Sequence, residues 1–226
     1  MQLYIGNKNY SSWSMRPWVL MRQAGIAFDE VMLRFDAFTP ESKFKTALSR
    51  VSPAGRVPVL VDAGFAVWDT LAIAEYLAEK LPEKQLWPAG VQARARARSV
   101  CAEMHSGFSA LRSHFPMNIE AQLPEVGPRV LTEAPAALAD LARINQLWDE
   151  LLSQHGGPFL FGAFTIADAT FAPVVMRLAT YGLPVPATVA AYMARVKAAP
   201  GVAAWIDEAL AEQDYLAFEE PYRAAR

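Results

Sequence analysis

The chain has 226 residues, of which 53% are hydrophobic and 19% charged, and its formal net charge is -2. It is long enough to bury a sizeable core, carries no charge excess that would attract nucleic acid, and has no stretch near the ~20 apolar residues of a membrane span. Its one cysteine, Cys101, excludes an internal disulfide and a cysteine-rich metal site, so we expect a cytoplasmic protein that holds no metal.

The first eighty or so residues alternate between strand and helix patterns. Apolar runs predict strands at residues 3–5, 28–35, 57–61 and 65–68, with a tight turn joining the last two. Helical periodicity predicts helices at residues 17–24, 40–51 and 70–81, the third of them capped by Asp69. This βαβαββα order predicts a four-stranded mixed sheet with helices on its faces.

The pattern after Pro82 is helical throughout. Proline and glycine clusters separate four or five predicted helices, at residues 89–114, 129–154, 166–182, 187–199 and 202–212. No convincing strand pattern occurs in this half. We therefore predict an α/β domain at residues 1–81, a linker at 82–88 and an all-α domain at 89–226.

Pro58 lies inside an apolar strand, where a proline has no N–H to give a neighbouring strand. A cis peptide bond between Val57 and Pro58 would turn the preceding peptide outward, towards a ligand. The βαβαββα order resembles thioredoxin, a fold with a cis-proline at this place beside its active site. The resemblance therefore predicts a cis Val57–Pro58 bond.

The loop before the first helix reads Ser11-Ser12-Trp13-Ser14, where redox members of the thioredoxin fold carry Cys-x-x-Cys. Without a thiol there, disulfide exchange by the protein itself is excluded. Hydroxyls at a helix N-terminus favour a bound anion, because N–H groups and the helix dipole point the same way. The same serines also suit a simple capping role.

Four segments resemble signatures of the glutathione transferase superfamily. They are SSWSMR at residues 11–16, similar to SSCSWR of the zeta class with Trp13 in place of the cysteine; SPAGRVPVL at 52–60; DTLAIAEYL at 69–77; and FTIAD at 164–168, which also has the form of a capping box. The resemblance covers essentially the whole chain. It implies a thioredoxin-like N-terminal domain followed by an all-helical one, and a homodimer in which each N-terminal domain packs on the partner's helical domain.

This resemblance implies glutathione as co-substrate. Asp69 would pair with the ammonium of the γ-glutamyl group, and Thr70 would hold the carboxylate of the same group. The Val57 backbone beside Pro58 would pair with the cysteinyl backbone as an added strand does. The remaining candidates are the cations Lys43 and Arg56 for the terminal carboxylate, and Ser14, which we expect to cap the first helix.

The resemblance also implies an activated thiol. A free cysteine thiol has a pKa of roughly 8.5, so about 3% of it is thiolate at pH 7. By its spacing to Arg16, Ser11 is the expected hydroxyl donor to the thiolate, with Ser12 as the alternative. A small electrophile would bind between the domains. Its candidate contacts lie at the start of the helical half: His105, Phe108, Arg112 and Phe115. The polar residues of this segment suggest a substrate with a polar or acidic group, which Arg112 would meet.

Three functions are compatible with these signatures. The first is a glutathione transferase of the detoxifying type. The second is an isomerase of the maleylacetoacetate type, which the serine motif favours although Trp13 replaces the cysteine. The third is a non-catalytic glutathione-binding or stress module, which would not need Ser11, Pro58 and the Asp69-Thr70 pair. A thiol reductase of the omega kind does not fit a chain without an active-site cysteine.

Overall fold

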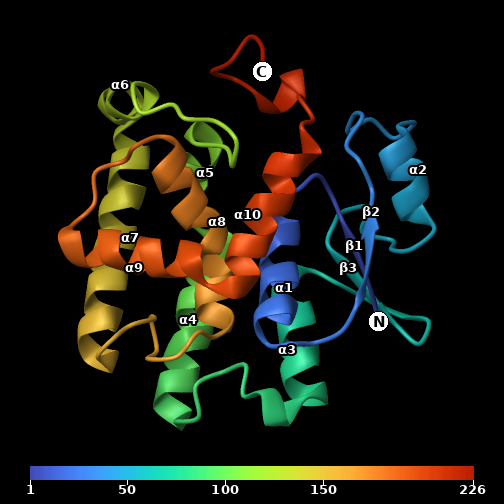
Figure 1. Ribbon diagram of the computed structural model, residues 1–226, viewed down its shortest axis with the longest axis horizontal. Helices are drawn as coiled ribbons and strands as arrows, with labels where there is room; N and C mark the ends of the chain where they lie inside the picture. Colours follow the sequence, from blue (N-terminus) through green and yellow to red (C-terminus); the bar gives the residue numbers. More distant parts are fainter.

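The computed structural model describes residues 1–226 and contains a four-stranded sheet at one side of a helical body (Figure 1). The strands are β1 (Gln2–Ile5), β2 (Asp29–Met32), β3 (Val59–Asp62) and β4 (Phe65–Trp68), in the order β2-β1-β3-β4. β1 pairs in parallel with β2 and antiparallel with β3, and β3 pairs antiparallel with β4. The predicted mixed sheet is therefore confirmed.

Three helices belong to this N-terminal domain: α1 (Ser12–Gln23), α2 (Lys43–Ser49) and α3 (Thr70–Lys80). α1 begins earlier than predicted, so Pro17 lies inside the helix and Ser11 takes the N-cap position. Ser14 is consequently in the first turn and caps nothing, which corrects our expectation. Asp69 does cap α3, because its carboxylate accepts hydrogen bonds from the N–H groups of Leu71 and Ala72.

The second half contains only helices. They are α4 (Val91–Ser106), α5 (Ser109–His114), α6 (Val126–Glu133), α7 (Pro135–His155), α8 (Ile166–Thr180), α9 (Ala187–Ala198) and α10 (Pro200–Glu212), with short 3-10 turns at Pro82–Lys84 and Ala217–Glu219. The predicted count of four or five was wrong, because two predicted helices are each divided in two. The domain boundaries at 1–81, 82–88 and 89–226 stay a prediction.

Local backbone chemistry explains both divisions. A Cβ at Gly107 would lie 2.7 Å from the carbonyl oxygen of Glu103, and the next residue, Phe108, has a left-handed φ of 52°. α4 therefore ends at Ser106, and α5 begins at Ser109. Pro135 cannot donate a backbone hydrogen bond, so it begins α7 rather than continuing α6, and Ala134 before it leaves the helical conformation.

Helix α8 occupies the centre of the helical half and is buried along almost its whole length. It packs against α1 of the N-terminal domain, which lies between the helical body and the sheet in Figure 1. One continuous hydrophobic core therefore includes residues from both halves. This packing sets Arg177 of α8 beside Ser12 of α1.

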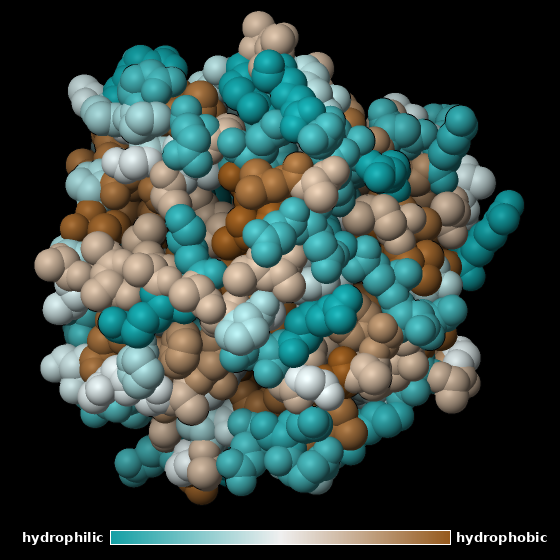
Figure 2. Space-filling model, viewed as in Figure 1, coloured by the Kyte–Doolittle hydropathy of each residue, from teal (hydrophilic) through white to brown (hydrophobic).

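None of the helices is long and apolar enough to cross a membrane. On the face drawn in Figure 2, hydrophobic residues form separate areas among hydrophilic ones. The large hydrophobic side chains that are exposed come from several elements, with Phe65 and Trp68 on β4, Phe38 in the loop before α2 and Phe218 in the 3-10 turn near the C-terminus. Phe38 and Phe218 contact each other edge to face, with their ring centroids 5.3 Å apart.

The capping box at the start of α8 gives a direct stability prediction. The Thr165 hydroxyl accepts a hydrogen bond from the Ala167 N–H at 3.3 Å, and the Asp168 carboxylate accepts one from the Thr165 N–H at 2.9 Å. Thr165→Ala removes the first of these, so we expect a loss of about 1 kcal/mol in the free energy of unfolding by urea. Thr132→Ala, at an exposed position of α6, is the control and should change little. An equal loss in both variants would contradict a specific capping role.

Candidate active site

Two adjoining cavities lie between the N-terminal domain and the helices α4, α5 and α8. The serine cavity, of about 420 Å³, contains Ser11 and Ser12, and the aspartate cavity, of about 430 Å³, contains Asp69 and Thr70. Both cavities share four lining residues: Trp13, Arg56, Val57 and Arg112. The two therefore form one cleft, with a hydroxyl-bearing end and a carboxylate-bearing end.

The serine cavity is built on the N-terminus of α1. The Ser11 and Ser14 hydroxyl oxygens are 2.7 Å apart, and Ser14 also accepts a hydrogen bond from the Gly6 N–H at 3.1 Å. Ser14 is fully buried and does not line the cleft, whereas Ser11 and Ser12 do. Ser14 can contact a ligand only through Ser11, so its place differs from the direct glutathione contact that we predicted.

Ser12 is hydrogen-bonded to a buried cation. Arg177 of α8 donates from Nη2 to the Ser12 hydroxyl oxygen at 3.1 Å, and its Nη1 donates to the carbonyls of Arg112 and Phe115. Burial, with the nearby charge of Arg112, lowers the pKa of Arg177 to about 10. Because Ser12 accepts from a guanidinium, its own proton is free to be donated into the cavity.

The Trp13 ring contacts two further guanidinium groups. The Arg16 guanidinium carbon is 4.1 Å from the centroid of the Trp13 ring, and the Arg112 carbon is 5.1 Å from it. Arg16 is buried, its Nε and Nη1 have no hydrogen-bond partner, and burial together with the charges of Arg177 and Arg112 lowers its pKa to about 9. The aromatic ring thus stabilises cations that no carboxylate neutralises.

The aspartate cavity combines a cis-proline with a helix N-terminus. The Val57–Pro58 peptide bond is cis, as predicted. Asp69 has a left-handed φ of 77°, which is uncommon for a residue with a side chain, and its carboxylate reaches the first N–H groups of α3. The Thr70 hydroxyl is buried without a partner. A buried hydroxyl at a helix N-terminus is suited to hold the carboxylate of a ligand.

His105 approaches this cavity from α4. Its Nε2 is 3.3 Å from the second carboxylate oxygen of Asp69, and its ring contacts Trp13 edge to face with the centroids 5.2 Å apart. The His105 Nδ1 is buried without a partner. His105 lines the aspartate cavity and not the serine cavity, and its predicted contact with the electrophile stays a prediction.

Other predicted residues divide into those that line the cleft and those that do not. Arg56 and Arg112 line both cavities. Lys43 is exposed outside the cleft lining, and the cation that α2 contributes is Lys45, whose Nζ donates to the Gly55 carbonyl at 2.7 Å. The prediction of Phe108 and Phe115 as pocket residues was wrong, because both are buried in the core and line neither cavity.

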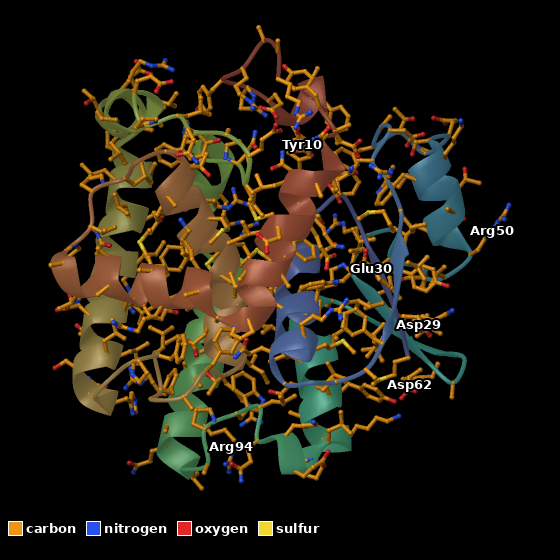
Figure 3. The ribbon with its side chains drawn as sticks, viewed as in Figure 1. Tyr10, Asp29, Glu30, Arg50, Asp62 and Arg94 are labelled. Atoms are coloured by element: carbon orange, nitrogen blue, oxygen red, sulfur yellow. The ribbon has the colours of Figure 1, made fainter.

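Several lining residues that are distant in the chain were not predicted from the sequence. Tyr10, labelled near the C-terminal segment in Figure 3, lines the serine cavity. Its hydroxyl donates to the Glu220 carboxylate at 2.7 Å, and burial raises its pKa to about 12. Glu219, on the C-terminal segment, is the only acidic residue in this lining. Arg177 had a detectable signal, since it is the only charged residue in α8 after the capping residue Asp168.

Models of two protein domains match the chain. The model of the glutathione S-transferase N-terminal domain matches residues 10–80, and that of the glutathione S-transferase C-terminal domain matches residues 92–208. The first match contains both Ser11 and Thr70, and the second contains His105, Arg112 and Arg177. Together the two matches include most of the cleft.

Similar proteins and solved structures agree with these models. The chain is 34% identical to glutathione S-transferase theta-1 of Mus musculus over 69% of this chain and 67% of the relative. It is 27% identical to a probable maleylacetoacetate isomerase of Caenorhabditis elegans over 80% of each, and 26% identical to a stringent starvation protein A homolog of Coxiella burnetii over 87% and 85%. A Burkholderia glutathione transferase homolog with bound glutathione superposes with a TM-score of 0.69 at 26% identity, covering 94% of this chain and 98% of that one.

Proposed function

Because the chain belongs to the glutathione S-transferase family, we propose that it binds glutathione in the cleft, holds the thiol as thiolate and transfers it to an electrophile. The observation that carries this proposal is the continuity of the two cavities. The cis-proline, Asp69 and Thr70 line one, the hydroxyls of Ser11 and Ser12 line the other, and both share the Val57 backbone. A tripeptide with a central thiol fits such a sequence of groups.

Each part of glutathione has a partner of suitable chemistry in this proposal. The γ-glutamyl ammonium pairs with Asp69, and the γ-glutamyl carboxylate binds the Thr70 hydroxyl at the N-terminus of α3. The cysteinyl backbone pairs with Val57. The terminal carboxylate binds Arg56 and Lys45, which replaces Lys43 because only Lys45 lines the cleft. The thiol then lies near Ser11 and Ser12.

The mechanism requires the thiol to ionise near neutral pH. A hydroxyl donor and a helix N-terminus both favour the thiolate over the thiol. The Ser11 hydroxyl donates to the Ser14 oxygen at 2.7 Å, and Ser14 also accepts the Gly6 N–H. A thiolate beside Ser11 can replace Ser14 as the acceptor, while Ser14 turns its own hydroxyl proton towards the Ser11 oxygen. The Ser11 proton is then available to the thiolate. The thiolate attacks an electrophilic carbon, a carbon–sulfur bond forms and the leaving group departs with its bonding electrons.

Binding of glutathione is the first measurement, with Thr70→Val as the diagnostic variant. Valine keeps the shape of threonine but removes the hydroxyl, so we expect the dissociation constant from calorimetry to rise about tenfold. Thr132→Val, at an exposed position far from the cleft lining, should bind as the wild type does. If the wild type binds glutathione and Thr70→Val binds it with the same dissociation constant, the proposed orientation of the γ-glutamyl group is wrong.

An isomerase is the second candidate, favoured by the similarity to the probable maleylacetoacetate isomerase and by the serine motif. An isomerase uses the same thiolate, which adds to a cis double bond and leaves after rotation about the resulting single bond. Glutathione is then not consumed. Measuring free glutathione during turnover separates the two, since conjugation consumes one molecule for each product and isomerisation consumes none.

A non-catalytic module is the third possibility, and the similarity to stringent starvation protein A homologs keeps it open. Such a module has no need of an activated thiol. If the wild type fails to bind glutathione in calorimetry, this function replaces the transferase. If it binds glutathione without lowering the thiol pKa, a glutathione-binding module is favoured over an enzyme.

A further inference from the structure

The serine cavity has an uncompensated positive charge. Lys45, Arg56, Arg112 and Arg177 line it, Arg16 borders it through Trp13, and none of these five cations has a carboxylate within ion-pair distance. Several cations elsewhere are paired: Lys8, Arg98 and Arg143 each lie 2.7 Å from a carboxylate. Unpaired cations outside the cleft, such as Lys43 and Arg50, are exposed to solvent, whereas Arg16 and Arg177 are buried. A group of like charges in a partly desolvated cleft is stabilised by an anionic ligand.

Arg177 is the most constrained of these cations. Its side chain is buried, and three of its five N–H bonds are engaged: two by the carbonyls of Arg112 and Phe115 and one by the Ser12 hydroxyl. Two donors therefore remain on a guanidinium that lines the cavity. A guanidinium that is already fixed loses little entropy when it binds a planar carboxylate.

Glutathione leaves Arg177 without a partner. This step rests on the proposed function, in which Thr70 binds one carboxylate of glutathione, Arg56 and Lys45 bind the other, and Asp69 binds the ammonium. No remaining carboxylate of glutathione is available to Arg177. Apolar side chains form much of the remaining lining of the same cavity: Phe35, Phe38, Phe44 and Met117.

We propose that the serine cavity takes an electrophile with one carboxylate on an apolar body, and that Arg177 binds this carboxylate with Arg112 beside it. The apolar lining contacts the apolar body of the electrophile, and the Arg177 guanidinium binds its carboxylate. With a chloronitrobenzoate as probe, the glutathione sulfur bonds to the ring carbon, the carbon–chlorine bond breaks, chloride leaves with the bonding pair, and the thiol proton passes to solvent.

A substitution of Glu219 should change the binding of a carboxylate in the direction opposite to a substitution of Arg177. It is the only acid in the lining, burial raises its pKa, and the charge of Arg177 acts to lower it. The charges of Glu219 and Arg177 therefore interact electrostatically, although the two side chains form no ion pair. Removing the negative charge with Glu219→Gln should strengthen the attraction of Arg177 for a substrate carboxylate, whereas Arg177→Met should abolish it.

The experiment compares binding of nitrobenzoate and nitrobenzamide, which differ in charge but hardly in shape. Calorimetry is done on the full chain with and without S-methylglutathione, which fills the glutathione site and does not react. We expect the wild type to prefer nitrobenzoate by about tenfold, Arg177→Met to lose this preference, and Glu219→Gln to increase it about threefold. Circular dichroism checks that each variant is folded, and Glu219→Gln carries the test if Arg177→Met is not.

Each outcome has a definite meaning. Equal binding of the two probes to the wild type, or no binding of nitrobenzoate, overturns the proposal. So does a preference that neither substitution alters. If Arg177→Met raises the pKa of the bound glutathione thiol and leaves the preference intact, Arg177 serves the thiolate and not the electrophile. If nitrobenzoate binds as expected but glutathione does not, the anion site stands and the proposed transferase function fails.

Discussion

Ser11→Ala is expected to lower kcat/KM for conjugation by about a hundredfold, while the dissociation constant of glutathione, measured well below the pKa of the bound thiol, stays nearly unchanged. The wild type should depress the thiol pKa of bound glutathione from roughly 8.5 to about 6.5, and the variant should return it towards its free value. The reason is that the hydroxyl stabilises the thiolate and contributes little to binding of the neutral thiol. The pKa is measured from the ultraviolet absorbance of the thiolate as a function of pH, and affinity from calorimetry.

Ser12→Ala is the matched control, because Ser12 lines the same cavity and adjoins Ser11 in the chain. It removes the hydrogen bond from Arg177 but leaves the Ser11–Ser14 contact in place. We expect a smaller effect on the thiol pKa than Ser11→Ala has. If instead Ser12→Ala returns the thiol pKa to its free value and Ser11→Ala does not, the donor is Ser12, polarised by the guanidinium. If neither variant changes the pKa, hydroxyl activation of the thiol is wrong.

The sequence signals that succeeded are local ones. Asp69 and Thr165 carry short polar side chains directly before apolar periodic segments, and both act as helix caps in the structure. The hairpin of β3 and β4 follows from two apolar runs around a glycine turn. The cis Val57–Pro58 bond was predictable from the resemblance to a known fold, since most bonds before proline are trans.

The failures concern long-range packing. Phe108 and Phe115 were placed in the pocket because they lie near it in the chain, yet their side chains are directed into the core, which periodicity alone cannot reveal. Lys43 and Lys45 both have the right charge, and only the orientation of α2 selects Lys45. Glu219 reaches the cleft on a C-terminal segment far from Ser11 in sequence, and the sequence contains no sign of that contact.

Lys8→Met is expected to have the largest effect on stability, because Lys8 joins three elements of the fold. Its Nζ lies 2.7 Å from Glu30 of β2 and 2.5 Å from Glu208 of α10, and its side chain is 5% exposed. The ammonium also lies 5.2 Å from the ring centroid of Trp18. Glu30, labelled in Figure 3, extends from β2 towards α1, where it accepts a hydrogen bond from the Trp18 indole. Removing the cation leaves Glu30 partly buried without its charge partner.

We expect Lys8→Met to lower the free energy of unfolding by about 3 kcal/mol, measured by urea denaturation. Adding Glu30→Gln to it should recover part of the loss, because a glutamine carries no unpaired charge and can still accept the hydrogen bond from the Trp18 indole. Lys80→Met breaks an ion pair with Asp62 at an exposed position and should have little effect. If Lys8→Met lowers the free energy of unfolding no more than Lys80→Met does, the ion pairs of Lys8 do not contribute the expected stability. If the double variant is no more stable than Lys8→Met alone, the loss does not come from an unpaired Glu30.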